Sequence, residues 1–132
     1  LALTEPEAGL ASALAGAAPT EWSLYDTHYT ERYMSTPQEN PEGYAETDIL
    51  PRLDDLTGRL LILHGMADDN VIFGNATRVI DALQAKSAPF EMMLYPGQRH
   101  GVRGDPRQLQ QWRTYLDFLV RTIGTRSHDA QD

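Results

Sequence analysis

The stretch Arg59-Leu-Leu-Ile-Leu-His-Gly65 is the clearest strand signal in the 132-residue chain. Its central residues are all apolar, a pattern typical of a parallel strand covered on both faces. Phe90-Glu-Met-Met-Leu-Tyr95 is a second run of strand length. Between them the apolar residues recur with a helical period, which predicts a helix over about 73–86 (Ile72, Ala76, Val79, Ile80, Leu83). Strand, helix and strand in this order predict a right-handed parallel crossover.

The flanking segments extend this pattern. Leu10–Gly16 is small and apolar throughout, so it fits a buried strand or a helix. A helix is expected from about Leu24 to Met34, and 35–52 reads as loop with a short helix at 41–47. Asp105-Pro106 predicts the start of the last helix, with an apolar face that follows (Leu109, Trp112, Leu116, Leu119, Ile123). We therefore predict an α/β fold of parallel strands with flanking helices over 1–124, and a flexible tail over 125–132.

The composition disfavours several classes of partner. Lys and Arg number 11 against 19 Asp and Glu, which gives a net charge of −8. With no basic stripe, nucleic acid and anionic membrane surfaces are not expected partners. The chain has no cysteine, and no apolar stretch approaches the roughly 20 residues that span a bilayer. Leu1-Ala-Leu-Thr-Glu-Pro-Glu-Ala8 is unlike a signal peptide and reads as the end of a helix from a longer chain.

Acidic residues and a histidine follow the two strand runs. Asp68 and Asp69 come shortly after the first, and His100 follows the second through the turn Pro96-Gly-Gln-Arg99. Function gathers at the carboxyl ends of parallel strands, where an acid and a histidine are two members of a Ser-Asp-His triad. Spacing alone does not choose between the two acids. A Gly-x-Ser-x-Gly nucleophile turn is absent from the sequence, so the triad is expected to lack its serine here.

Other interpretations use the same residues. Either acid would serve as a cap for the helix that begins near Phe73, and His100 would then be an ordinary loop residue. A metal site built from His64, Asp68, Asp69 and His100 is a weaker alternative, since no usual ligand spacing supports it. Aromatic residues at helical spacing, here Tyr25 and Tyr29, most often form a plain core stripe. His28 and His128 receive no role.

Three blocks of sequence resemble one family of peptidases. They are Trp22-Ser-Leu-Tyr-Asp-Thr-His-Tyr-Thr-Glu-Arg-Tyr-Met34, His64-Gly-Met-Ala-Asp-Asp-Asn-Val71 and Tyr95-Pro-Gly-Gln-Arg-His-Gly101. Together they resemble the C-terminal part of the α/β-hydrolase domain of dipeptidyl peptidase IV-type serine peptidases, in the prolyl oligopeptidase family. The resemblance extends over about 1–124.

The resemblance implies a role for individual residues. Asp68 would be the catalytic triad's acid and His100 its general base. Asn70 would hydrogen-bond a backbone carbonyl of the substrate. The proline-accepting pocket would be lined by aromatic residues and one valine (Trp22, Tyr25, Tyr29, Val71). Pro19 departs from the family pattern, because it stands where a pocket valine is usual, which puts the depth of the pocket in question. No metal or organic cofactor is implied.

The expected parent is a serine peptidase that releases N-terminal dipeptides after proline or alanine. Its nucleophile, oxyanion-hole donors and β-propeller would lie upstream of Leu1, so this chain alone is predicted to be inactive. The alternatives are another α/β hydrolase, such as an acylaminoacyl peptidase or esterase, and a non-catalytic binding or packing module. A sheet without its first strands exposes an edge, which predicts self-association or pairing with the missing part. A periplasmic or membrane-associated parent is suggested by the resemblance alone.

Overall fold

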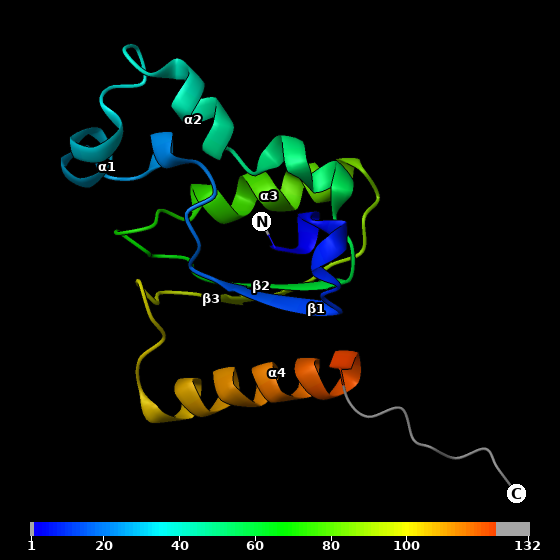
Figure 1. Ribbon diagram of the computed structural model, residues 1–132. Helices are drawn as coiled ribbons and strands as arrows, with labels where there is room; N and C mark the ends of the chain where they lie inside the picture. The colour runs from blue at the N-terminus through cyan, green and yellow to red at the C-terminus, as the bar shows by residue number, and fades with distance from the viewer. Residues whose placement is uncertain (1, 124–132) are drawn as a thin grey trace, which may run out of the picture.

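The computed structural model describes residues 2–123, so the tail expected over 125–132 lies outside the described residues. A small sheet separates two helical layers (Figure 1). Helices α1 (Thr27–Met34), α2 (Pro41–Thr47) and α3 (Gly74–Ala85) lie on one side of the sheet, and α4 (Asp105–Ile123) lies alone on the other. Short 3-10 turns complete the chain: η1 (Ala2–Thr4), η2 (Pro6–Ala8), η3 (Trp22–Leu24) and η4 (Leu50–Asp55).

The sheet contains three parallel strands in the order β1-β2-β3. They are β1 (Ser12–Gly16), β2 (Arg59–Gly65) and β3 (Glu91–Tyr95). Gly16 lies opposite Leu63, and Gly65 lies opposite Tyr95. The predicted α/β fold is therefore confirmed, and of the two structures that fitted Leu10–Gly16 the strand is the one that forms. Because the strands are parallel, the residues that follow β2 and β3 emerge at the same edge.

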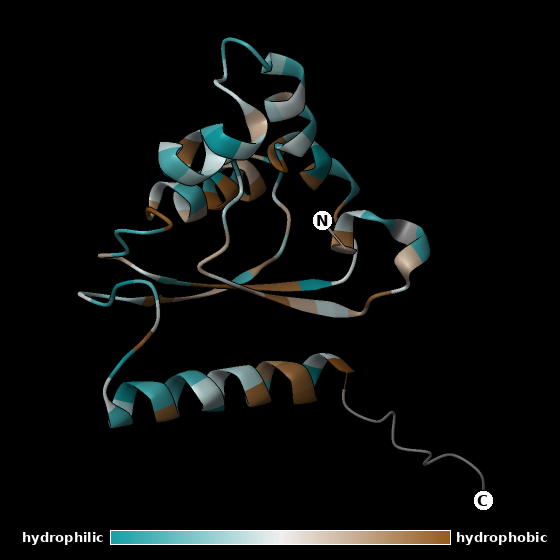
Figure 2. Cartoon of the chain, turned by 60° about the vertical axis from the view of Figure 1, so that its left-hand side comes forward, coloured by the Kyte–Doolittle hydropathy of each residue, from teal (hydrophilic) through white to brown (hydrophobic). Residues whose placement is uncertain are grey.

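Strand β2 is buried on both faces, which explains its unbroken apolar run. Leu60 and Ile62 belong to a cluster with Val79 and Leu83 of α3. The alternate residues of β2 face the other way and pack with residues that include Phe118 of α4 (Leu61, Leu63). Figure 2 shows the corresponding hydrophobic colouring along the strands. The middle strand is thereby held between two separate cores, which fixes the position of its carboxyl end, where the polar turn begins.

Two expectations for the first half of the chain need correction. The helix expected from Leu24 begins only at Thr27, because Asp26 adopts an extended backbone and its Oδ1 accepts a hydrogen bond of 2.9 Å from the Tyr29 N–H. This is an N-cap, which ends the helix in the N-terminal direction. The short helix at Pro41–Thr47 forms as predicted. The loop reading of 35–52 missed the η4 turn that starts at Leu50 and crosses the end of that segment.

The apolar residues of α4 are divided between two sides of the helix. Tyr115, Phe118 and Leu119 pack against the sheet. Most of the face expected from the sequence points elsewhere, and four of its five members are more than half exposed (Leu109, Trp112, Leu116, Ile123). Among residues 2–123 no helix has the length and apolar character needed to cross a membrane.

Candidate active site

The turns after β2 and β3 are joined through their backbones. The Met66 N–H donates to the Tyr95 carbonyl at 3.0 Å, and the Ala67 N–H donates to the Gln98 carbonyl at 2.9 Å. Gly65 makes this approach possible, because a Cβ there would lie 2.3 Å from the Arg99 carbonyl oxygen. The two turns therefore meet at a position where any larger residue would push them apart.

Asp68 and His100 are hydrogen-bonded across these turns. His100 Nδ1 lies 3.0 Å from Asp68 Oδ2. The other carboxylate oxygen of Asp68 accepts from the N–H groups of Asn70 at 2.9 Å and Val71 at 3.0 Å. A carboxylate accepts, so His100 carries its proton on Nδ1 and leaves Nε2 with a lone pair. Nε2 of His100 has no hydrogen-bond partner among residues 2–123.

Asp69 has a different partner, although it is adjacent in sequence. Its Oδ2 lies 2.7 Å from Arg99 Nη1 at the surface. Neither acid caps α3, because the N-cap position of that helix is Phe73 and it receives no side-chain hydrogen bond. The cap interpretation is therefore wrong, and Asp68 is the acid that reaches the histidine.

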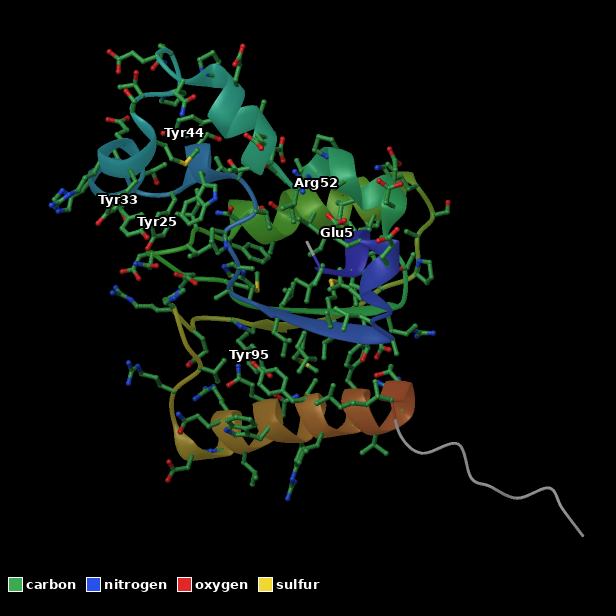
Figure 3. All side chains as sticks on the ribbon, in the orientation of Figure 1. Glu5, Tyr25, Tyr33, Tyr44, Arg52 and Tyr95 are labelled. Carbon is green, nitrogen blue, oxygen red and sulfur yellow. The ribbon has the colours of Figure 1, made fainter. Side chains whose placement is uncertain are left out.

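Four aromatic rings lie in contact beside the acidic turn. The Trp22 ring stacks on that of Tyr29, with 6.2 Å between the ring centroids. It meets the Tyr25 ring edge-on, with a centroid distance of 5.6 Å. Tyr33 extends the group, with its ring centroid 5.0 Å from that of Tyr29. Figure 3 labels Tyr25 and Tyr33, which lie near each other beside α1. Tyr29 is 51% exposed, so the interpretation as a plain core stripe does not hold for it. The contacts form although Trp22 and Tyr25 precede α1, where a shared helical face had been expected.

The aromatic cluster (Trp22, Tyr25, Tyr29, Tyr33) is tied to the acidic turn. The Tyr25 hydroxyl donates to Asn70 Oδ1 at 3.3 Å, which leaves the amide NH₂ of Asn70 as a donor for another group. Val71, the next residue, is buried. Asn70 thus connects the ring cluster with the Asp68 carboxylate, which accepts from the N–H groups of both Asn70 and Val71.

A buried asparagine, Asn75, holds the segment before the aromatic cluster, and the motifs of the sequence do not point to it. Asn75 Oδ1 accepts from the Thr20 N–H at 2.9 Å and from the Glu21 N–H at 3.3 Å. Burial raises the pKa of the Glu21 carboxyl, while the Arg78 guanidinium opposes this shift and Asp48 adds to it. The only sequence signal was a polar residue between the apolar positions of the predicted helix.

Two hollows flank the sheet. One, of about 250 Å³, lies beside His100 and is lined in part by Tyr95, Gln111 and Tyr115. Burial raises the pKa of the Tyr95 hydroxyl, which lies between the sheet and α4 (Figure 3). The other, of about 340 Å³, is apolar and is lined by Pro19 but by none of the aromatic cluster. In the described part of the chain, no group of three or more His, Cys, Asp or Glu residues is arranged to hold a metal ion.

Parallel strands with helices on both faces, and an acid and a histidine on adjacent strand ends, define a portion of an α/β hydrolase. The family model of the prolyl oligopeptidase family matches residues 2–126, and the chain belongs to that family. It is 35% identical over 118 residues to dipeptidyl peptidase 8 of Homo sapiens, covering 86% of this chain. It is 42% identical over 93 residues to the probable dipeptidyl-aminopeptidase B of Neurospora crassa, covering 67% of this chain.

The solved structures agree with this assignment. The crystal structure of Porphyromonas gingivalis dipeptidyl peptidase 4 superposes with a TM-score of 0.87 at 33% identity, and the match covers 91% of this chain and 17% of that one. The chain spans only 13% of the length of the human relative and 10% of that of the Neurospora relative. It therefore corresponds to a short part of these proteins.

Proposed function

We propose that this chain supplies the acid, the general base and the proline pocket of a dipeptidyl peptidase, whose serine comes from outside the 132 residues. The observation that carries the proposal is the 3.0 Å hydrogen bond between His100 Nδ1 and the buried Asp68 carboxylate. It fixes the tautomer in which Nε2 can accept a proton. The names of the relatives and the aromatic cluster beside the acid support the choice of substrate.

The proposed reaction is acyl transfer in two halves. The serine oxygen attacks the carbonyl carbon of the scissile bond while His100 Nε2 takes the hydroxyl proton. His100 then gives this proton to the leaving amine as the C–N bond breaks. Water attacks the acyl ester, again losing its proton to Nε2, and the serine regains a proton as the dipeptide leaves. Asp68 accepts from Nδ1 throughout and stabilises the imidazolium that forms twice.

The aromatic cluster fits a proline ring in the position before the cut. A proline residue is flat and apolar and has no backbone N–H that needs a partner. Trp22, Tyr25 and Tyr29 offer ring faces and edges, and Asn70 has a free NH₂ to donate to a substrate carbonyl. These contacts support proline, and by its small size alanine, as the residue accepted there.

The test uses a polypeptide in which this chain is joined to the proposed serine-bearing part of the enzyme. It is expected to hydrolyse Gly-Pro and Ala-Pro anilides and to act poorly on the N-acetylated forms. Preference for the acetylated substrates would favour the acylaminoacyl peptidase alternative. Failure to hydrolyse any of these substrates would favour the alternative that the chain is a non-catalytic module. The 132-residue chain alone is expected to be inactive in the same assay.

We also propose that the isolated chain self-associates. β1 is an edge strand of the described sheet and pairs only with β2. An unpaired edge is a template for another strand. Size-exclusion chromatography of the chain is expected to give species larger than a monomer, and a stable monomer across concentrations would contradict this.

A further inference from the structure

His64 is a buried titratable side chain that the proposed reaction does not use. It lies near the end of β2, and its side chain is 1% exposed. The centroid of its ring lies 5.6 Å from that of the Phe73 ring. A buried imidazole needs hydrogen-bond partners inside the protein. The partners of His64 are therefore a guide to what the ring does.

The proton of His64 can be assigned from its nearest partner. Nε2 lies 2.8 Å from the carbonyl oxygen of Val71. A carbonyl oxygen can only accept, so Nε2 must carry a hydrogen. The same nitrogen lies 3.4 Å from Asp68 Oδ2. One N–H therefore faces two oxygens of the turn after β2, the Val71 carbonyl at close range and the Asp68 carboxylate at longer range.

These contacts place Asp68 Oδ2 between two imidazole rings. His64 approaches from the buried side, and His100 approaches from the surface at 3.0 Å. The contact with Val71 also ties the far end of the turn to β2, in addition to the hydrogen bonds that Asp68 makes within the turn. A side chain that contacts both the last residue of the turn and its carboxylate limits rotation of that carboxylate.

We propose that His64 is a positioning residue, whose Nε2–H clamps the turn at 66–71 and keeps Asp68 Oδ2 directed at His100 Nδ1. Its value for catalysis rests on the proposed function. The clamp itself is a property of the chain as described, so it can be tested without a serine or a substrate.

The first measurement needs no substitution. In the ¹⁵N-labelled chain, couplings between ring protons and nitrogens show which nitrogen of each histidine is protonated. The proposal expects a proton on Nε2 of His64 and on Nδ1 of His100. An unprotonated Nε2 on His64 would overturn the proposal, whether or not any variant folds.

The second measurement removes the clamp. His64→Phe keeps a ring beside Phe73 but has no donor, whereas His64→Gln keeps an N–H of similar reach. The His100 Nδ1–H signal is expected to exchange with water at least about tenfold faster in the Phe variant, and to recover most of its protection in the Gln variant. Equal exchange rates in wild type and the Phe variant would overturn the proposal.

A core variant separates positioning from general stability. Leu83→Ala truncates a fully buried side chain of α3, which belongs to the apolar core and has no hydrogen-bonding group. It is expected to lower the melting temperature and leave exchange of the His100 proton nearly unchanged. If it accelerates that exchange as much as His64→Phe does, the clamp is not specific. An enzyme with intact histidine signals and no peptidase activity would contradict the proposed function alone.

Discussion

The turn after β2 buries its Asp68 carboxylate and holds it by backbone hydrogen bonds, whereas the turn after β3 exposes its histidine, although both turns follow the carboxyl ends of adjacent parallel strands. The side chain of Asp68 is 0% exposed and that of His100 is 47% exposed. Backbone N–H groups hold the carboxylate on one side, and the histidine turn relies on glycines with positive φ at 97 and 101. The difference suits a pair in which the acid is fixed and the base must reach a reacting molecule.

The turn after β2 should be most sensitive to change at its buried carboxylate. In the polypeptide that includes the serine, Asp68→Asn should lower kcat by about 10⁴-fold, because the amide favours the wrong tautomer of His100. Asp69→Asn, one residue along, should change kcat less than about threefold, since Asp69 lies at the surface in an ion pair with an exposed arginine. Steady-state hydrolysis of a Gly-Pro anilide checks both. Similar losses in the two variants would contradict the assignment of Asp68.

The contact between the two turns can be broken at Gly65. Gly65→Ala places a Cβ against the Arg99 carbonyl and should destabilise the chain by about 1–3 kcal/mol, through displacement of the histidine turn. Gly74→Ala is the matched control, because a Cβ there meets only Ile72 at ordinary contact distance. It should be neutral or up to about 1 kcal/mol stabilising. Urea unfolding of both variants measures the difference, and equal stabilities would refute the steric argument.

The Tyr25 hydroxyl supports the turn after β2 from outside, through Asn70. Tyr25→Phe keeps the ring but removes the hydrogen bond to Asn70, and should lower kcat/KM for Gly-Pro anilide by about 2- to 10-fold. Tyr33→Phe removes an exposed hydroxyl from the same aromatic cluster, and should have no measurable effect. If the two variants behave alike, Asn70 does not depend on the Tyr25 hydroxyl for its orientation.

The exposed turn should respond least. Arg99→Ala removes the ion pair with Asp69, whose partners are 74% and 59% exposed, and should cost less than about 1 kcal/mol. The loss should shrink further in high salt, which screens exposed charges. Thermal unfolding at low and high salt gives the measurement. A large loss that salt does not reduce would mean that the histidine turn is held more firmly than its exposure indicates.

Most of the fold follows from local patterns in the sequence. Strand β2 and helix α3 have the unbroken apolar run and the helical period that predict them, and both form within two residues of the expected positions. The 3-10 turn at η4 has no such period, so the sequence predicts a loop there. The sequence also could not predict that the apolar face of α4 is exposed. Periodicity shows that residues share a face, but it does not show which face packs against the sheet.

The site divides in the same way. Spacing along the chain brought an acid and a histidine to one edge, but choosing Asp68 over Asp69 required the resemblance and then the hydrogen bond itself. His64 and Asn75 act through contacts with residues that only the fold brings near them. His64 ends an apolar run and Asn75 is a polar residue between the apolar positions of a predicted helix, and neither pattern names a partner.

The most direct test of the central claim is the loss of His100 in the polypeptide that includes the serine. His100→Ala should reduce kcat for Gly-Pro anilide by at least about 10⁴-fold, because triad members act as a unit. His28→Ala, on an exposed position of α1, should retain full activity and serves as the control. Hydrolysis by His100→Ala at a rate close to that of wild type would contradict the account of this chain as the source of the general base.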